Sequence, residues 1–223
     1  MDAFVPFPKV PRLSRECVIT EKIDGTNASI HIKQVHDCDD LDALPPEAFV
    51  FDTDSGTLAM VAASRKRYIG VGSLPGEKNP DNQGFAAWVY ENRDDLLGLG
   101  EGSHFGEWWG QGIQRGYGLK EKRFSLFNTG RWTGQYSTPN LTRLDGKHER
   151  ERAPNCCDIV PVLTTGLFRE IIWEEALNSL KISGSFAASF DNPEGIMIFH
   201  VAAQSFFKKT IKNDAAPKSQ VVQ

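Results

Sequence analysis

The sequence predicts an α+β fold rich in antiparallel sheet, and two patterns lead to this expectation. Short apolar runs with β-branched or alternating residues recur along the chain and are bounded by turn residues, which is typical of strands. Residues 85–97 and 167–181 instead repeat apolar residues at helical spacing. No internal repeat or linker-like stretch divides the 223 residues, so we expect a single α+β domain.

The elements are expected in the following order. An extended, proline-containing arm covers residues 1–16, the domain covers 17–212, and a polar tail covers 213–223. The hairpin in residues 49–65 turns at Asp54-Ser55-Gly56. The strands are predicted at 18–22, 28–33, within 49–65, at 104–110, at 123–128 and as a pair within 194–212. Loops are predicted at 37–47, 74–84 and 110–118, with an exposed excursion at 128–158.

Composition excludes several classes of protein. A formal net charge of −4 argues against a strongly basic protein that coats nucleic acid, although basic residues cluster in 64–70 and 206–212. No apolar run reaches the roughly 18 residues that a membrane span needs. The first 16 residues lack the apolar core of a secretion signal. We therefore expect a cytoplasmic location and no membrane partner.

The cysteines give little sign of a metal site. Four cysteines are present without a CxxC pair. The segment His36–Asp40 (HDCDD) carries zinc-binding residue types, so a zinc site there is one alternative. We favour reduced structural thiols, as expected in a cytosol.

The segment 17–34 (CVITEKIDGTNASIHIKQ) places a lysine where an ordinary surface lysine has no reason to be. Lys22 ends a β-branched run, and Asp24-Gly25 gives the turn signal before an alternating strand. This placement predicts a lysine that the end of a strand presents into a cleft.

Five elements carry the candidate chemistry, and each is weak alone. A KxDG pattern recurs by chance, and an EG pair before an apolar strand is usually a turn. Their common order along one chain is the informative feature. The elements are Glu21–Gly25, Ser64-Arg65, Phe105–Trp108, Phe124–Phe127, and Glu194–Ile198 followed by Phe207–Lys209.

With these elements in this order, the sequence resembles the covalent nucleotidyltransferases, the superfamily of ATP-dependent polynucleotide ligases and mRNA capping enzymes. It looks most like the RNA ligase branch that includes the phage double-strand-repair RNA ligases. The resemblance extends from about Cys17 to Ile211. It implies an antiparallel-sheet-rich nucleotidyltransferase domain, the ATP-grasp-like adenylation domain of ligases, without an OB-fold domain.

The resemblance also implies roles for individual residues. Lys22 matches the nucleophile that becomes adenylated, and Glu107 matches the acid that hydrogen-bonds the nucleoside sugar. Phe127 matches the aromatic residue that stacks on the purine, with Phe124 as the alternative ring. Glu194 matches the acid associated with a divalent metal, and Lys208 matches the first lysine of the last motif.

Further residues are implied by their places in the same motifs. Asp24 belongs to the catalytic KxDG motif, and Arg65 matches an arginine that contacts the nucleotide sugar and phosphate. The other nucleotide-binding residues implied are Glu21, Ile23 and Lys209.

The sequence departs from the family pattern in its last motif. The family usually has a second lysine two residues after the first, and this position holds Thr210. Either Lys209 or Lys212 is expected to replace it. The chain ends about ten residues beyond Lys212, from which we expect neither a capping role nor an appended domain that grips a nicked duplex.

The chemistry of these residue types agrees with the resemblance. An amine attacks phosphorus only when unprotonated, and cations such as Lys208, Arg65 and a bound Mg²⁺ or Mn²⁺ disfavour the ammonium form. The same cations neutralise the phosphates of ATP. A carboxylate such as Glu194, together with ATP phosphates, suffices for a hard metal that keeps several waters.

The resulting expectation is an ATP-dependent RNA ligase. One option for its origin is a phage, in which case it would act in the host cytoplasm. Its partners would be RNA or nicked nucleic acid with 5′-phosphate and 3′-hydroxyl ends, with a protein partner or self-association as an option. One alternative is an adenylyltransferase that modifies another acceptor or needs a partner chain to ligate. Another is a non-catalytic nucleotide-binding module, against which the intact Lys22–Gly25 motif and Glu194 speak.

Overall fold

The computed structural model describes residues 4–72, 81–134, 150–212 and 214, and it confirms an α+β fold dominated by antiparallel sheet. The chain divides into two compact units: residues 1–22 with 161–223 form unit 1, and residues 23–160 form unit 2. The predicted limits of arm, domain and tail stay predictions. No helix in the described ranges is long and apolar enough to cross a membrane.

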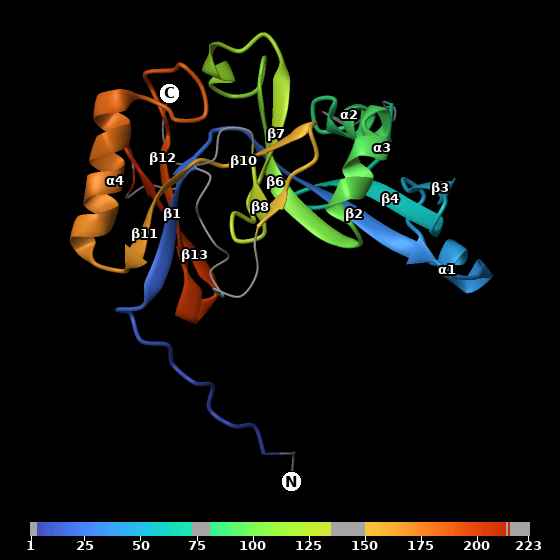
Figure 1. Ribbon diagram of the computed structural model, residues 1–223, viewed down its shortest axis with the longest axis horizontal. Helices are drawn as coiled ribbons and strands as arrows, with labels where there is room; N and C mark the ends of the chain where they lie inside the picture. Colours follow the sequence, from blue (N-terminus) through green and yellow to red (C-terminus); the bar gives the residue numbers. More distant parts are fainter. Residues whose placement is uncertain (1–3, 73–80, 135–149, 213, 215–223) are drawn as a thin grey trace. The chain divides into compact units, whose positions relative to one another are not determined.

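Unit 1 is a four-stranded antiparallel sheet with one long helix (Figure 1). The strand order is β11-β1-β12-β13, with each pair antiparallel. The described part of the arm, residues 4–15, precedes it without helix or strand. The elements are β1 (Glu16–Lys22), β11 (Val162–Leu167), α4 (Glu170–Ser183), β12 (Gly195–His200), the 3-10 turn η3 (Val201–Ala203) and β13 (Ser205–Thr210).

The helix α4 covers one face of this sheet because alternate strand residues are apolar. Ile19 on β1 and Ile196 on β12 are fully buried against Leu180 of α4. Since successive strand residues point to opposite faces, Lys22 and its neighbour Glu21 must face opposite sides of the sheet. Because of this alternation, Glu21 lies on the face that α4 covers and Lys22 lies on the opposite face.

Unit 2 is built on a larger sheet. The order is β10-β7-β6-β2-β4-β3, with β5 beside β4, and only the β10–β7 pair is parallel within this sheet. The strands β8 (Trp132–Thr133) and β9 (Glu151–Arg152) form a separate parallel pair. The remaining strands are β2 (Thr26–Val35), β3 (Phe49–Thr53), β4 (Gly56–Ser64), β5 (Tyr68–Ile69), β6 (Gly102–Gly110), β7 (Lys122–Leu126) and β10 (Cys157–Ile159).

The helices α2 (Phe85–Glu91) and α3 (Arg93–Leu96) cover one face of the unit 2 sheet, and aromatic residues pack between α2 and the sheet. Phe85 of α2 packs on Trp108 of β6 and Phe124 of β7, with ring centroids 5.4 and 5.0 Å apart. All three side chains are buried. The helical elements are α1 (Cys38–Asp42), α2 (Phe85–Glu91), α3 (Arg93–Leu96), η1 (Leu97–Leu99) and η2 (Gly116–Gly118).

The predicted hairpin, the helix at 167–181 and the strand pair within 194–212 are confirmed. The helix expected at 85–97 is interrupted at Asn92. The expected loop at 37–47 is wrong in part because Asp37 caps α1, accepting a hydrogen bond from the Asp40 amide.

The exposed excursion expected at 128–158 is also corrected. Residues 135–149 lie outside the described ranges, but Trp132 is only 1% exposed and Ile159 only 5%. Both residues belong to the core of unit 2. Polar surroundings in the sequence concealed these apolar anchors.

Candidate active site

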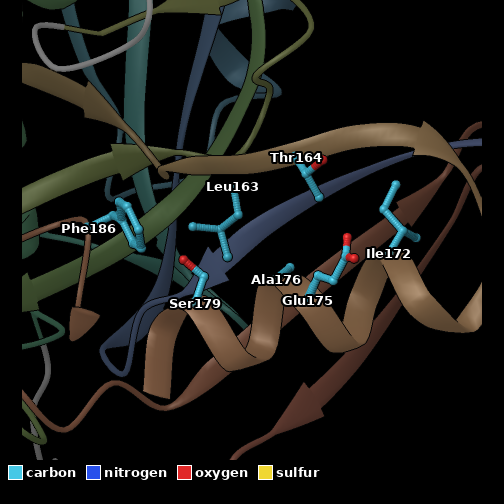
Figure 2. A pocket seen from close by; sticks show the side chains of 7 residues that line it. All are labelled: Leu163, Thr164, Ile172, Glu175, Ala176, Ser179 and Phe186. Atoms are coloured by element: carbon cyan, nitrogen blue, oxygen red, sulfur yellow. The ribbon is translucent and has the colours of Figure 1, made fainter. Parts of the chain in front are cut away.

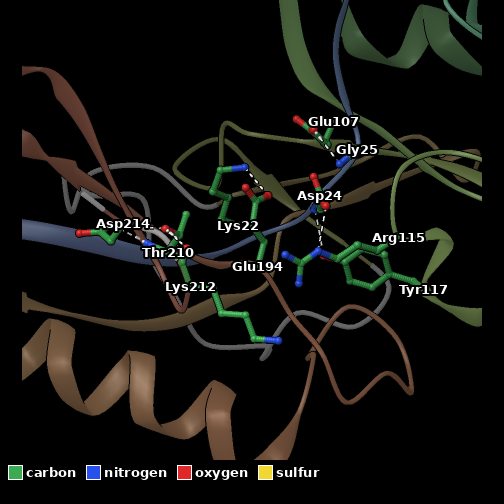
Figure 3. A network of polar contacts seen from close by, with 10 residues as sticks. All are labelled: Lys22, Asp24, Gly25, Glu107, Arg115, Tyr117, Glu194, Thr210, Lys212 and Asp214. Carbon is green, nitrogen blue, oxygen red and sulfur yellow. Dashed lines mark hydrogen bonds and ion pairs between the residues drawn. The ribbon is translucent and has the colours of Figure 1, made fainter. Parts of the chain in front are cut away.

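Lys22 and Glu194 form an ion pair within unit 1. Lys22 ends β1 opposite Gly195 of β12, so Glu194 lies at the same end of this strand pair. Lys22 Nζ donates to Glu194 Oε2 at 2.5 Å, and the two side chains are only 18% and 5% exposed (Figure 3). Charges interact more strongly where water is excluded. The structure thus brings together the predicted nucleophile and the predicted metal ligand.

Gly195 allows Glu194 to take this position. A Cβ atom at residue 195 would overlap the Lys209 carbonyl oxygen and lie 2.7 Å from Thr210 Cα. The neighbouring strand β13 therefore approaches too closely for any side chain. The Glu194 carbonyl also accepts a hydrogen bond from the Ile211 amide at 2.9 Å, which fixes the backbone beside the carboxylate.

The Glu21 carboxylate has a structural task on the other face of β1. It accepts hydrogen bonds from the Ser185 hydroxyl at 2.6 Å and from the amides of Phe186 and Ala187 at 2.7 and 3.1 Å. Burial raises the pKa of Glu21, and these three hydrogen bonds oppose that shift. The carboxylate holds the turn that follows α4. Because its side chain is engaged there, Glu21 could contact a nucleotide only through its backbone, and its nucleotide-binding role stays a prediction.

The two adjacent lysines of β13 lie on opposite faces of the sheet. Lys209 pairs with Ile196 on the helix-covered face, where its Nζ lies 2.9 Å from Asp214 Oδ2 and 5.2 Å from the Trp173 ring centroid. Lys208 pairs with Met197 on the other face, which is also the face of Lys22. Of the two, Lys208 therefore has the position that suits phosphate contact.

Thr210 occupies the row of the sheet that contains Lys22, since Gly195 pairs with both residues. The Thr210 amide donates to Asp214 Oδ1 at 2.8 Å, and its hydroxyl donates to the Lys212 carbonyl at 2.9 Å (Figure 3). The hydrogen bonds from the Thr210 amide and from Lys209 lower the pKa of Asp214. Because Lys209 is held by Asp214 on the other face, Lys212 is the better candidate for the missing second lysine.

Asp24 is fixed within unit 2 by two residues of the glycine-rich segment 110–118. Its Oδ2 accepts from Arg115 Nε at 2.9 Å, and its amide donates to the Tyr117 hydroxyl at 2.9 Å (Figure 3). Asp24 is 7% exposed and Tyr117 is 1% exposed. A buried carboxylate requires such a partner, and these contacts fix the Asp24 carboxylate and backbone within unit 2. The catalytic role expected for Asp24 stays a prediction.

Gly25 and Glu107 are joined by a hydrogen bond from the Gly25 amide to Glu107 Oε1 at 3.1 Å. A Cβ atom at residue 25 would lie 2.5 Å from the Trp108 carbonyl oxygen and 2.9 Å from Glu107 Cγ. The glycine of the KxDG motif is therefore required by the close approach of β6. Glu107 itself is half-buried, which leaves part of its carboxylate accessible.

The structure separates the two candidate stacking rings. Phe124 is fully buried in the unit 2 core, whereas Phe127 is half-buried just beyond β7. The Phe127 amide donates to the Phe105 carbonyl at 2.9 Å, which continues the strand pairing to this residue. Of these two residues, Phe127 is the one that retains solvent exposure.

Arg65 and Ile23 differ in accessibility. Arg65 is exposed in a tight turn closed by the Ser64 amide, which donates to the Arg67 carbonyl at 2.9 Å. The Ile23 side chain is 3% exposed and belongs to the interior. Any nucleotide contact of Ile23 is therefore limited to its backbone.

Arg115 and Tyr117 were missed by the sequence reasoning. The segment GQGIQRGYG was predicted only as a glycine-rich loop, yet Tyr117 adopts a left-handed backbone with φ of 51°. A bulky residue in this conformation is held by its surroundings, here by the Asp24 amide and the Trp109 ring at 5.0 Å. A tyrosine among glycines was the available signal.

No group of three or more His, Cys, Asp or Glu side chains in the described ranges is arranged to hold a metal. In the segment considered for zinc, Asp40 instead binds the Lys33 ammonium and the His36 amide. These two donors lower the pKa of Asp40.

A small cavity of about 170 Å³ lies between α4 and β11 in unit 1 (Figure 2). Leu163, Ile172 and Phe186 are among the side chains that line it. No predicted site residue belongs to its lining, so we assign the candidate chemistry to the ion pair and not to this cavity.

Comparisons with known proteins identify a sequence family and structures that share the fold. A family model described as RNA ligase matches residues 15–212. Among curated proteins, none matches the chain. Two structures of mutants of the Naegleria gruberi RNA ligase, each with ATP and Mn, share the fold at 15% sequence identity and a TM-score of 0.50. Each match covers 90% of this chain and 51% of the ligase, so the chain spans about half the length of those proteins.

Proposed function

This chain belongs to the RNA ligase family, and we propose that it is an ATP-dependent RNA ligase that acts through a covalent lysyl-AMP intermediate. The observation that carries the proposal is the Lys22–Glu194 ion pair, which lies largely out of solvent at one end of strands β1 and β12. A lysine held against a carboxylate with little exposure is positioned for chemistry and is poorly explained by solubility.

In the first step the unprotonated Lys22 Nζ attacks the α-phosphorus of ATP. A phosphoramidate N–P bond forms, the bond to the β-phosphate breaks, and pyrophosphate leaves. Lys22 must lose a proton before attack, and the adjacent Glu194 carboxylate is 2.5 Å from Nζ. Glu194 therefore has the geometry to accept the proton or to position the amine.

In the two later steps, AMP moves from Lys22 to the 5′-phosphate of a nucleic acid and is then displaced. The first of these transfers forms a phosphoanhydride and returns the lysine amine. A 3′-hydroxyl then attacks the activated 5′-phosphate, a phosphodiester forms, and AMP leaves. Lys208 lies on the same sheet face as Lys22 and would neutralise phosphate charge in these steps.

The nucleoside is assigned to unit 2. We assign Glu107 to the ribose, Phe127 to the adenine face, and Arg65 to the sugar and phosphate. The half-buried Phe127 and the fully buried Phe124 support the choice of ring. Asp24 acts through the backbone that it fixes with Arg115 and Tyr117.

Glu194 is the residue assigned to Mg²⁺ or Mn²⁺. Its carboxylate supplies the oxygen ligand that these hard cations prefer, and ATP phosphates and water would complete the coordination. A bound divalent cation would supply charge neutralisation for the phosphates.

Incubation with ATP and Mg²⁺ followed by intact-mass measurement tests the adenylation. The mass should increase by one AMP, and Lys22→Ala should abolish the increase. Lys33→Ala is a matched control because Lys33 is also ion-paired with a carboxylate, that of Asp40. AMP uptake by the Lys22→Ala variant would refute the assigned nucleophile.

Joining is tested separately with pre-adenylated enzyme in a single turnover. Matched substrates carry either RNA or DNA at the 3′-hydroxyl terminus. We expect the RNA terminus to react faster, since a 2′-hydroxyl is the feature by which a protein separates RNA from DNA. Equal or faster joining of the DNA terminus would refute the RNA assignment and leave the adenylation chemistry standing. AMP uptake without joining of either would favour the alternative adenylyltransferase.

A further inference from the structure

The face of the unit 2 sheet opposite α2 and α3, termed the open face, carries a row of aromatic rings that the adenylation chemistry does not use. The His31 ring lies edge-on to Tyr68 at 5.4 Å and to Phe105 at 6.0 Å between ring centroids. Tyr68 and Phe105 are 42% and 52% exposed. Large exposed rings that cluster on adjacent strands mark a binding surface more often than isolated ones do.

Two serines fix the centre of this row. His31 Nε2 hydrogen-bonds the Ser29 hydroxyl at 3.0 Å, and His31 Nδ1 hydrogen-bonds the Ser103 hydroxyl at 2.8 Å. Burial lowers the pKa of His31, which favours the neutral ring near pH 7. With both nitrogens bonded, the imidazole supports the two outer rings, whose geometry therefore exists before any ligand binds.

The row continues to the residues assigned to the nucleoside. Phe105 and Glu107 are two residues apart on β6, so they face the same side of the sheet. The Phe127 amide is bonded to the Phe105 carbonyl, which places Phe127 next to the row. The open face thus leads from Glu107 and Phe127 through Phe105 to Tyr68.

Basic residues border the far end of the row. Arg65, Lys66 and Arg67 are exposed and immediately precede Tyr68. The turn that presents them is closed by the Ser64 amide and hydroxyl, which both donate to the Arg67 carbonyl at 2.9 and 3.2 Å. Three successive cations beside exposed aromatic rings are complementary to a polyanion with flat bases and unsuited to an apolar partner.

We propose that the open face of unit 2 binds single-stranded RNA, with bases stacked on Phe105 and Tyr68 and phosphates beside Lys66 and Arg67. The proposal deepens the proposed ligase function and rests on it for the choice of RNA as ligand. Sheet aromatics that stack two or three bases are an established mode of RNA recognition. The strand would lead toward Phe127, the ring assigned to the adenine.

Fluorescence anisotropy with a labelled single-stranded RNA of about 12 nucleotides, without ATP, tests the surface. Phe105→Ala and Tyr68→Ala should each weaken binding about 5- to 150-fold, the range for loss of one stacked base. Phe105→Tyr and Tyr68→Phe should retain most of the affinity because the ring face persists. Unchanged affinity in both alanine variants would overturn the proposal.

Tyr90→Ala is the matched control, since Tyr90 is 47% exposed but lies on α2 and packs on Phe49. Its RNA affinity should equal that of the unmodified chain. Lys66→Ala should reduce the slope of log K against log salt by roughly 0.7, the value for one single-strand phosphate. An unchanged slope would overturn the phosphate assignment.

AMP uptake measured in the same variants separates this inference from the proposed function. RNA affinity should fall at least fivefold further than the rate of AMP uptake, whereas an equal fall in both would overturn the RNA surface. Absence of AMP uptake in the unmodified chain would refute the proposed function and leave the RNA measurement interpretable. Sedimentation velocity of the same variants tests whether a second copy of the chain occupies this face instead. If the substitutions change self-association without changing RNA affinity, the face is a protein interface and the proposal is wrong.

Discussion

Removing the lysine of the Lys22–Glu194 pair should lower the free energy of unfolding, independently of any effect on catalysis. Lys22→Met keeps an unbranched chain and removes the ammonium, so it leaves a carboxylate that is 5% exposed without its 2.5 Å partner. Breaking a buried pair in this way typically costs about 3–5 kcal/mol. Because Lys22 retains 18% exposure, water offsets part of this cost, and we expect about 3 kcal/mol.

Urea unfolding of the two single variants and the double variant measures this value. Glu194→Gln in the Lys22→Met background removes the buried charge and should bring the stability back to within about 1 kcal/mol of the unmodified chain. The comparison forms a double-mutant cycle, which isolates the coupling of the two residues. A Lys22→Met cost below about 1 kcal/mol, or no recovery in the double variant, would refute the reasoning.

The same variants test whether Glu194 holds a divalent cation, without any measurement of activity. Mn²⁺ should stabilise Lys22→Met, because the carboxylate has lost its ion pair with Lys22. At ten times its dissociation constant a ligand contributes about 1.4 kcal/mol. Mn²⁺ should leave the double variant with Glu194→Gln unchanged. Equal stabilisation of both variants would place the metal elsewhere.

Three further predictions concern other residues of the site. Gly25→Ala should cost about 1–3 kcal/mol in urea unfolding through overpacking against β6, whereas Gly70→Ala, whose Cβ would lie 3.5 Å from its nearest neighbour, should cost far less. Phe127→Ala should weaken ATP use in adenylation by about 1–3 kcal/mol through lost stacking, and unchanged kinetics would contradict the assignment. Because the pKa of Glu21 is raised from 4.5, its contribution to stability is fully present below pH 4.5 and is lost as the pH rises through the raised value. Urea unfolding at several pH values should therefore show that the difference in free energy of unfolding between the unmodified chain and Glu21→Gln becomes smaller as the pH rises. A difference that grows with pH would contradict the raised pKa of Glu21.

The fold was predictable where a single period dominates the sequence. The alternation in 49–65 and the helical spacing in 167–181 lead to β3, β4 and α4 because one face of each element is buried. The region 128–158 misled because its buried anchors, including Trp132 and Ile159, are isolated among polar residues. Periodicity cannot detect an element of two or three residues.

The site was predictable to the extent that its residues are neighbours in the sequence or belong to recognisable motifs. The motif order selected Lys22 and Glu194, which the structure joins across 172 positions of sequence. It could not show that the Glu21 carboxylate is bound by the turn after α4, because that contact depends on what packs on each side of β1. Arg115 was equally out of reach, since its partner Asp24 comes from a distant strand end.

The four residues Lys22-Ile23-Asp24-Gly25 have separate physical reasons for their identity. Lys22 ends a strand of unit 1 beside Glu194, while the Ile23 side chain is buried. Asp24 requires a carboxylate because Arg115 is there to pair with it, and Gly25 requires the absence of a Cβ because β6 lies within 2.5 Å. Three successive peptide bonds therefore connect the Lys22 residue to Gly25. Burial fixes Ile23, an ion pair fixes Asp24, and the close approach of β6 fixes Gly25. A loss at Asp24 or Gly25 should then displace the Lys22 amine without removing it, so such variants should react slowly at the same lysine and not at a new one.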